Sequence, residues 1–416
     1  MRTSSSTAAW AIAATWPWAS CGSSATKTSA MSRWELHNPS NEFLTFIHLS
    51  KAKNYMDYKE AITHYACPIQ NFTFACKDNN IAINHQGKMP VKWPGQGKFI
   101  LDGTRSSHLY KRYISMDSLP QETNPSCNYV FSANQHPTNT DYPYYYNGYY
   151  SETRANRIHQ LLENENDFDI QKMESIQLDN TNSFASDAAP VLINHINRTG
   201  LNENQKAMLA QMESWKGTYD FNDEDAELFE LWWKNTKNFT WDELKQYPFY
   251  LKSPDDYILL NLIQKDPSNS YFDKQGTPSI ENADDIIQTA FKVAFQEYEE
   301  KKKMETPVWS NFNKVNIMHM TEIEAFSRTN MPASGYPEAI NATSDSWGPS
   351  WRMIVELGDK PKAFGIYGGG QSGNIGSPYY DNFVDDWNKG QYYPLQFYSS
   401  GQEAKKQTLT TWTLTK

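Results

Sequence analysis

The sequence has few cysteines, and they are not arranged to hold a metal. Four occur in the 416 residues: Cys21, Cys67, Cys76 and Cys127. No two of them have the C-x-x-C spacing of a zinc ligand pair, and the nine histidines are scattered. These absences argue against a zinc domain and a disulfide scaffold, although Cys67 and Cys76 flank a predicted hairpin closely enough to meet.

Long apolar runs and basic stripes are also missing. No apolar segment approaches the ~20 residues that a membrane-spanning helix needs. The formal net charge is −10, and the longest basic run, residues 301–303, directly follows two glutamates. An acidic chain without a basic patch is a poor nucleic-acid binder, and a short lysine run is typical of a solvated helix end. The sequence therefore predicts neither a membrane span nor a nucleic-acid partner.

Aromatic residues, by contrast, are abundant, at 14% of the chain with 25 Tyr and 14 Trp. This composition is typical of a folded protein with a large core, not of a disordered one. By its length the chain is one large domain or several smaller ones. The aromatic load would also suit a carbohydrate-binding protein, but no motif supports that alternative.

The first 33 residues differ in character from the rest. One arginine, a short apolar stretch and small residues precede Cys21, as in a lipoprotein-type export signal, with Trp18 where an aliphatic residue is usual. The alternative is a segment without a folded role that results from a misassigned start. We treat residues 1–33 as an unrelated leader.

Residues 34–150 are predicted to mix helix and strand. A helix is expected from Ser40, a favourable capping residue, with Phe43, Phe46 and Ile47 on one face. This segment would supply the helix and core strands of a first region.

Two strand patterns follow that helix. Apolar alternation on both sides of a polar turn at residues 77–80 predicts a hairpin over residues 72–83. The segment NYVFSANQHP, residues 128–137, is predicted to be an apolar strand that ends at a polar tip before Pro137.

Residues 151–305 are predicted to be largely helical. Residues 202–217 have helical spacing with Gly217 as a stop, and Thr240 begins a capping-box pattern. Residues 284–303 carry aspartates at their start and lysines at their end, which matches a helix dipole. The apolar stripe of that helix is Ile287, Phe291, Ala294, Phe295 and Tyr298.

Strand patterns return in residues 306–416. In residues 351–357 apolar and other residues alternate strictly, and residues 363–369 form a second short strand pattern. One face of the predicted strand carries Trp351, Met353, Val355 and Leu357, and the other carries Arg352, Ile354 and Glu356. Strands, a helical block and then strands again predict an α+β fold with a helical insertion.

The segment GGGQSGNIGSPYYDNFVDDWNKGQYYPL, residues 368–395, combines a glycine tract with a predicted helix over residues 377–389. Ser377 is placed to cap this helix, Pro378 to occupy its first position and Gly390 to end it. The buried face is expected at Tyr380, Phe383, Val384 and Trp387.

The glycine tract matches neither of two catalytic loops. A P-loop needs a lysine followed by Ser or Thr after its second glycine, and no lysine occurs before Lys389. A Gly-x-Ser-x-Gly elbow fails because Ser372 has Gly370 two places before it but Asn374 two places after it. Ser372 is therefore not a predicted nucleophile, and the glycines indicate a sharp turn or close packing.

The same segment resembles the C-terminal signature of the penicillin acylase (penicillin amidase) family of N-terminal-nucleophile hydrolases. The elements that carry the resemblance are Gly-Gln-Ser-Gly-Asn, Ser-Pro-x-Tyr and Trp-x-x-Gly, preceded by GPSWRMIVELGD. The similarity extends back through FSRTNMP, IQLDNTNSFASDAAP, YVFSANQHPTNTDYP and NPSNEFLTFIHLSKAKNY. It covers residues 34–400 and matches the C-terminal part of the family's β-subunit.

The resemblance implies a fold and an activity. The fold would be part of an αββα N-terminal-nucleophile sandwich with a large helical insertion. The activity would be hydrolysis of acyl amides such as penicillins or acyl-homoserine lactones. The penicillin substrates would connect the chain with antibiotic biosynthesis. The family also implies a periplasmic or secreted location.

In this family a serine exposed by self-cleavage attacks the amide, and its own α-amine is the base. The resemblance implies that Asn134, within SANQHP, donates a hydrogen bond to the oxyanion, since an amide N–H₂ donates without a charge change. It also places Arg154 in the active-site region, with Arg157 one helical turn further on.

The nucleophile is not found in the chain. Ser-Asn pairs occur at Ser40, Ser268 and Ser310, inside segments that match other parts of the family. Most family calcium ligands are missing as well, and Tyr146 stands near where some members have a calcium-binding aspartate. We expect no metal site and assign no cofactor. The expected partner is the missing α-subunit or N-terminal β-segment. The chain alone would be an inactive fragment.

The alternative is a structural or binding remnant of the acylase fold. An upstream reading frame with a serine-asparagine opening strand would favour the hydrolase. In either case, a sandwich without its first strands would expose sheet edges and apolar faces.

Overall fold

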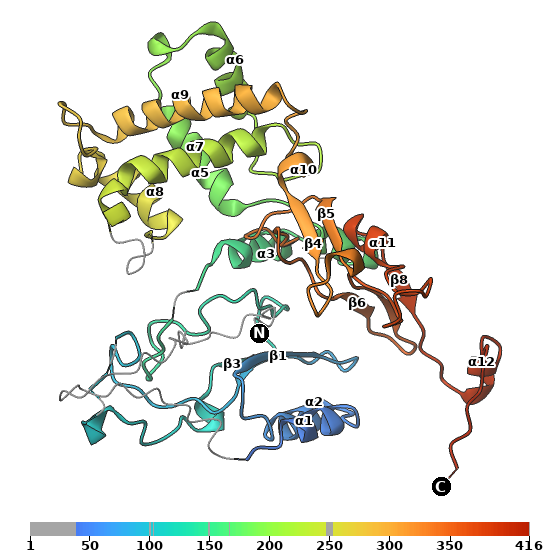
Figure 1. The fold of residues 1–416 in the computed structure, drawn as a ribbon. Helices are drawn as coiled ribbons and strands as arrows, with labels where there is room; N and C mark the ends of the chain where they lie inside the picture. Colours follow the sequence, from blue (N-terminus) through green and yellow to red (C-terminus); the bar gives the residue numbers. More distant parts are fainter. Residues whose placement is uncertain are drawn as a thin grey trace, which may run out of the picture. The chain divides into compact units, whose positions relative to one another are not determined.

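The chain is divided into two compact units, Met1–Ala155 with Leu357–Asp359 and Asn156–Glu356 with Lys360–Lys416. The computed structural model describes residues 39–99, 101–102, 104–148, 150–165, 167–246 and 253–415, and the expected leader lies outside them. Both units contain helices and antiparallel strands, so the fold is mixed α+β, as predicted (Figure 1).

The first unit packs helices against one face of a small sheet. Its elements are α1 (Glu42–Leu49), α2 (Tyr55–Ile62), β1 (Gln70–Ala75), β2 (Ile81–Gln86), η2 (Ser106–His108), η3 (Met116–Ser118) and β3 (Gln121–Thr123). The sheet is antiparallel with the order β1-β2-β3. The predicted hairpin is confirmed, with Thr73 paired to Ile83 and Asn79 in the turn at a φ of 60°. The Tyr58 ring of α2 stacks on Phe74 at 4.6 Å, so α2 covers this face of the sheet.

Helix α1 differs from its prediction at its start. It begins at Glu42 after Asn41, and Ser40 Oγ donates to the Glu42 carboxylate at 2.8 Å instead of capping the helix. Phe43 and Phe46 are 76% and 53% exposed. The apolar side chains predicted to share one face of this helix therefore lie on the surface.

Two further features of the first unit differ from the sequence analysis. Cys67 and Cys76 flank the hairpin as thiols and form no disulfide with each other. Residues 128–137 form no strand, and Asn134 has a φ of 65°, outside the extended region that a strand needs. The polar tip predicted for this segment is a turn within it.

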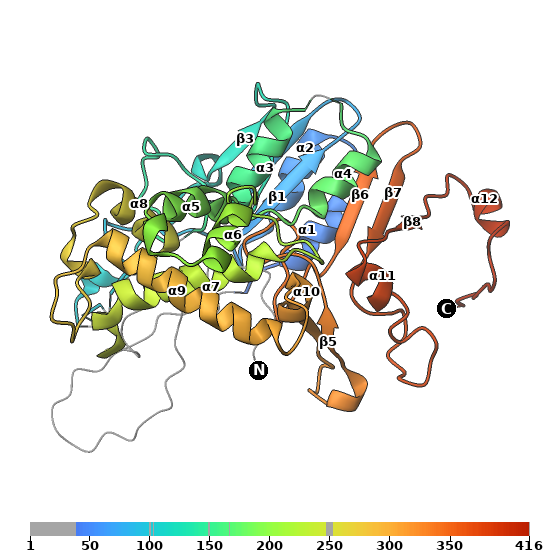
Figure 2. The same cartoon turned by 90° about the horizontal axis from the view of Figure 1, so that it is seen from above.

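Helices make up most of the second unit. They are α3 (Thr153–Glu163), which crosses the unit boundary, α4 (Ile170–Gln177), α5 (Ser183–Asn194), η4 (Arg198–Gly200), α6 (Glu203–Met212), α7 (Asp225–Thr240), η5 (Asp242–Gln246), α8 (Asp256–Lys265), η6 (Ser270–Phe272), α9 (Ala283–Lys302) and α10 (Trp309–Phe312). Helices α7 and α9 lie side by side (Figures 1 and 2), and the rings of Trp232 and Phe291 are 4.9 Å apart between them. The stripe predicted for α9 is confirmed as buried, and Asn282 caps the helix.

The capping box predicted at Thr240 is wrong. Thr240 is the last residue of α7, and its hydroxyl donates to the carbonyl oxygen of Thr236 at 2.9 Å. A threonine hydroxyl bonds equally well to the preceding helical turn, and the local pattern does not distinguish the two uses.

Strands and short helices form the rest of the second unit. They are β4 (Lys314–Ile317), η7 (Glu324–Phe326), β5 (Arg328–Pro332), β6 (Arg352–Glu356), β7 (Lys362–Ile366), α11 (Val384–Asn388), β8 (Tyr393–Leu395) and α12 (Gly401–Lys405). β4 pairs with β5, and the other strands form an antiparallel sheet β6-β7-β8. Among the helices in the described residues, none has both the length and the apolar character to cross a bilayer.

Strand β6 has the predicted alternation, but its apolar set is exposed. Trp351, Met353 and Val355 are 45%, 47% and 37% exposed. Arg352 and Ile354 are buried instead, at 5% and 7% exposure. Arg352 donates to the Trp387 carbonyl and to Asn341 Oδ1, which offsets the cost of burying its charge.

The exposed apolar side continues across the sheet. Met353 is paired with Gly365, and Gly365 with Tyr393, so the three positions share one face. A Cβ added at Gly365 would lie 2.8 Å from the Trp351 ring, which therefore covers that glycine. We call the surface formed by Trp351, Met353, Val355 and Tyr393 the open face.

A pair of neighbouring substitutions tests which side of β6 is the core. Ile354→Ala is expected to lower the free energy of unfolding by about 2–4 kcal/mol, because it opens a cavity in a packed region. Met353→Ala is expected to change it by less than about 0.5 kcal/mol, because that side chain lies on the open face. Urea unfolding of the two variants measures both values, and equal losses would contradict this assignment.

The helix predicted over residues 377–389 is shorter than expected. Helix α11 begins at Val384, and Ser377 Oγ accepts from the backbone N–H two residues on, which is a local turn. Val384 and Trp387 are buried, as predicted, and Gly390 has a φ of 71° just after the helix. The serine cap is therefore wrong, while the buried part of the face and the glycine stop are confirmed.

Candidate active site

Asn134 and Arg154 meet in the first unit. Arg154 Nη2 donates to Asn134 Oδ1 at 2.8 Å. Both side chains are partly buried, and Asn134 is in the left-handed backbone region at a φ of 65°. Asparagine tolerates that conformation better than most residues, and such backbone positions cluster at functional sites. Because Oδ1 is engaged by the guanidinium, the amide is fixed with its Nδ2 donor on the other side.

The turn around Asn134 is stabilised by the next side chain. Gln135 Oε1 accepts from the backbone N–H of Ala133 at 2.7 Å, and its Nε2 donates to the carbonyl oxygen of Phe131 at 3.2 Å. These bonds replace the ladder hydrogen bonds that a strand would have made. They explain why this apolar segment does not form a strand and how it presents Asn134.

Arg157 makes a different contact from Arg154. Its guanidinium donates to both carboxylate oxygens of Asp179, at 3.0 and 2.6 Å. A bidentate pair of this kind holds the side chain in one geometry. Of the two arginines that the sequence left as candidates, Arg154 is therefore the one that contacts Asn134.

A polar network beside this turn was not predicted from the sequence. His85 Nδ1 lies 2.6 Å from Asn71 Oδ1, and Tyr146 OH lies 2.9 Å from His85 Nε2. Burial lowers the pKa of His85 to about 4, helped by the nearby His136, so the ring is neutral above that pH. Burial also raises the pKa of Tyr146, which stays a phenol. Alternation in the hairpin places Asn71 and His85 on the same face, opposite Phe74. This shared face was the sequence signal from which their contact could have been predicted.

Tyr146 is the residue that the resemblance placed near a calcium-binding aspartate of some family members. Its hydroxyl bonds to His85, and a phenol is not a typical ligand of Ca²⁺. In the part of the chain that the structure describes, no group of three or more His, Cys, Asp or Glu side chains is placed to hold a metal ion.

The serines weighed as nucleophiles have other local roles. Ser40 bonds to Glu42, and Ser310 is buried within α10. Ser372 Oγ accepts from the backbone N–H of Asn374 at 3.1 Å, as in a turn. A Cβ at the neighbouring Gly370 would lie 2.2 Å from a carbonyl oxygen, so close packing explains that glycine.

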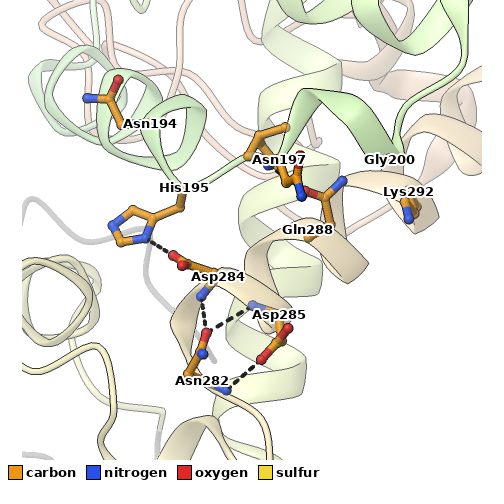
Figure 3. Close-up of a pocket in the computed structure, with 10 residues that line it drawn as sticks. Asn194, His195, Asn197, Gly200, Asn282, Asp284, Asp285, Gln288 and Lys292 are labelled. Carbon is orange, nitrogen blue, oxygen red and sulfur yellow. Dashed lines mark hydrogen bonds and ion pairs between the residues drawn. The ribbon is translucent and has the colours of Figure 1, made fainter.

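The second unit, called the helical unit below, contains a polar cavity of about 540 Å³ between the end of α5 and the start of α9 (Figure 3). In it His195 Nδ1 lies 2.5 Å from Asp284 Oδ1, and Asn282 caps α9. None of the described residues that line this cavity carries a hydroxyl or a thiol. The imidazole–carboxylate pair therefore has no hydroxyl or thiol to activate, and this is not a Ser-His-Asp site.

Two carboxylates on α7 have pKa values raised to about 7 by burial, Glu227 and Glu230. Glu227 Oε1 accepts from Lys301 at 2.5 Å, while its Oε2 is buried and has no partner in the described residues. Glu230 accepts from Tyr219 at 2.6 Å and from Tyr336 at 3.2 Å. These carboxylates bind protons near neutral pH and so affect the stability of the helical core.

An amide donor that an arginine holds at a strained turn suits a hydrolase that stabilises an oxyanion during acyl transfer. The family model described as penicillin amidase matches residues 11–404. The chain therefore belongs to the penicillin amidase family, which confirms the resemblance found in the sequence. The matched range includes residues 11–33, which the sequence analysis set apart.

Curated relatives include acyl-homoserine lactone acylases. The chain is 24% identical over 411 residues to acyl-homoserine lactone acylase QuiP of Pseudomonas syringae pv. tomato, covering 88% of this chain and 49% of that protein. It is 23% identical over 403 residues to QuiP of Pseudomonas aeruginosa, covering 85% and 47%. The chain thus spans about half the length of the curated relatives it matches.

Among solved structures, the thermostable penicillin G acylase from Alcaligenes faecalis is similar, with a TM-score of 0.62. The match covers 90% of this chain and 72% of that chain, at 15% sequence identity. At that identity the likeness establishes the fold.

Proposed function

We propose that this chain provides the oxyanion-stabilising part of an amidohydrolase that cleaves acyl amides. The observation that carries the proposal is the hydrogen bond from Arg154 to Asn134 Oδ1, which sets the orientation of the amide. Membership of the penicillin amidase family and relatives named as acyl-homoserine lactone acylases support cleavage of an amide C–N bond. Acyl-homoserine lactones and aromatic acyl amides, including penicillins, are the proposed substrate classes.

In the proposed reaction a serine oxygen attacks the amide carbonyl carbon, and the carbonyl electron pair moves to its oxygen. Asn134 Nδ2 donates to the oxyanion that forms. The serine proton passes to an amine base and then to the leaving nitrogen, so that the C–N bond breaks and an ester remains. Water then hydrolyses the ester to the free acid. Arg154 holds the Asn134 amide in orientation throughout, without contacting the substrate.

We propose that the attacking serine belongs to polypeptide outside these 416 residues. The chain spans about half the length of its curated relatives, so their remaining half has no counterpart here. The open face supports a partner, because monomeric proteins rarely expose contiguous apolar patches of this kind. Phe43 and Phe46 on α1 add a second exposed apolar surface.

Two further properties are proposed from the family. The fold would be part of an αββα sandwich with a large helical insertion. The location would be periplasmic or secreted, which cell fractionation of the expressing organism tests.

The test is an amine-release assay on an acyl-homoserine lactone and on a phenylacetyl amide. Purified chain is assayed alone and after refolding with the half of a relative that this chain does not match. Turnover only in the mixture supports the proposal. The second candidate, a non-catalytic binding remnant, is suggested by the open face. A stable complex without turnover on any acyl amide would favour it.

A further inference from the structure

A chain of hydrogen bonds runs from the sheet of the first unit to the turn that carries Asn134. Asn71 on β1 and His85 on β2 are paired across the hairpin, and their side chains meet at 2.6 Å. Asn71 Nδ2 donates to Ser132 Oγ at 2.7 Å, and Tyr146 OH bonds to His85 Nε2 at 2.9 Å at the other end. Four side chains from distant parts of the sequence therefore form one connected path.

The hydrogen bonds of this path are all donated in the same direction, from Tyr146 through His85 and Asn71 to Ser132. Because Asn71 uses its N–H₂ on Ser132, its carbonyl oxygen is the acceptor for His85 Nδ1–H. The imidazole Nε2 is then the acceptor for the Tyr146 hydroxyl. A neutral His85 is required, which agrees with its lowered pKa. The donors of Asn71, His85 and Tyr146 each have an acceptor in the path, which holds these side chains in one arrangement.

Ser132 brings this path to the oxyanion turn. It precedes Asn134 by two residues, a reach of roughly 7 Å along the backbone at most. The bond from Asn71 holds the start of the turn on the sheet, while Arg154 holds the Asn134 side chain. The turn is thus held through the Ser132 side chain at its start and through its functional amide.

We propose that Asn71, His85 and Ser132 are positioning residues for the oxyanion donor Asn134. This inference rests on the proposed function, because it assigns them to the same reaction. They do not contact the substrate; they fix where the amide N–H₂ points. An oxyanion donor must be held within roughly 0.5 Å of its productive place, and a strained turn without strand bonds needs external support to achieve this.

A purely structural role would not need these residue types. On the opposite face of the hairpin, Phe72 and Phe74 pack against the tyrosines of the first unit through apolar ring contacts. Polar side chains in a partly buried position are costly unless every group is bonded. In this unit the polar side chains of Asn71 and His85 lie on the face of the hairpin that is bonded to the Asn134 turn through Ser132.

The test follows the Asn134 side chain directly in the purified chain. The protein is labelled with ¹⁵N-asparagine, and the Asn134 N–H₂ signal is identified by its loss in Asn134→Ala. In Ser132→Ala the signal is expected to shift, and its exchange with solvent to accelerate about 10-fold or more. Ser132→Thr keeps the hydroxyl and is expected to restore the wild-type signal. Thr73→Ala, exposed on β1 two residues from Asn71, is the control and is expected to leave the signal unchanged.

An unchanged Asn134 signal in Ser132→Ala would overturn the inference, as would an equal effect of Thr73→Ala. If Ser132→Ala does not fold, Tyr146→Phe removes only the hydroxyl at the far end of the path. It is expected to move the same signal in the same direction, and no movement would again overturn the inference.

A second readout separates this inference from the proposed function. The complemented enzyme is this chain refolded with the half of a relative that it does not match. In it, Ser132→Ala is expected to lower kcat by about 10- to 100-fold while KM is unchanged, because only placement of the donor is lost. If the Asn134 signal responds but the wild-type mixture cleaves no acyl amide, the proposed function fails and the positioning path stands. If the wild type is active but Ser132→Ala neither moves the signal nor lowers kcat, the positioning path fails alone.

Discussion

Asn134→Ala is expected to lower the kcat of the complemented enzyme by about 10²–10³-fold, with little change in KM. The amide N–H₂ donates where negative charge develops, so its loss raises the energy of the transition state more than that of bound substrate. Steady-state amine release on an acyl-homoserine lactone gives both constants. Arg154→Lys is expected to give a smaller loss, because lysine lacks the planar guanidinium that fixes the amide.

The matched control for this prediction is Asn164→Ala, which removes an exposed asparagine just after α3. It is expected to keep wild-type kcat and KM. A complemented Asn134→Ala enzyme that is as active as the Asn164→Ala enzyme would remove Asn134 from the mechanism, and the proposed function would lose its main support.

Raising the pH from about 5 to about 8 is expected to destabilise the helical unit by several kcal/mol. The pKa values of Glu227 and Glu230 are about 7 in the folded chain, against 4.5 as the ordinary value. Between these values the folded state binds more protons than the unfolded state. The stabilisation is therefore complete below 4.5 and is lost as the pH rises through 7. Each carboxyl corresponds to roughly 3 kcal/mol at most.

Urea unfolding of the helical unit, followed by tryptophan fluorescence across this pH range, measures the effect. Glu227→Gln and Glu230→Gln are each expected to remove a large part of the pH dependence, while Asp225, whose pKa burial raises to about 6, contributes the lower part of the range. Glu300→Gln, whose side chain is 69% exposed, is expected to leave the pH dependence intact. An unchanged pH slope in both buried variants would show that these carboxylates are not protonated on folding.

The first unit is expected to respond to pH in the opposite sense. The pKa of His85 is lowered from 6.5 to about 4, so its neutral form is favoured by folding. Its contribution is complete above 6.5 and is lost as the pH falls through 4. Separate unfolding transitions with opposite pH slopes would distinguish the two units, and slopes of the same sign would contradict this assignment.

Much of the secondary structure was predictable because it depends on local periodicity. The hairpin of β1 and β2, helix α9 and strands β6 and β7 follow directly from alternation or helical spacing. Errors arose where a hydroxyl has two local uses. Ser377 and Thr240 both fit capping patterns, yet one closes a turn and the other bonds back to its own helix.

The side of a strand that is buried was less predictable than the strand. The alternation in β6 was correct, but Ile354 and Arg352 face the core, while Met353 lies on the open face. Periodicity separates two faces, and it does not say which face has a neighbour. Which face is buried depends on the segments from other parts of the chain that pack against the strand.

The candidate site was predictable only in part. Asn134 and Arg154 came from the family resemblance, and their hydrogen bond adds a physical reason for the pair. The predicted strand over residues 128–137 does not form, and Asn134 within it has a left-handed conformation, a conflict between local pattern and fold that is common at functional sites. His85 and Tyr146 were missed because their contact joins residues far apart in the sequence.

The central claim is that the chain carries an oxyanion donor but takes its nucleophile from other polypeptide. The most direct measurement is amine release from an acyl-homoserine lactone by the purified chain, alone and with the unmatched half of a relative. The account predicts no turnover by the chain alone and turnover in the mixture that depends on Asn134. Turnover by the chain alone would contradict it, because a nucleophile would then lie within these 416 residues.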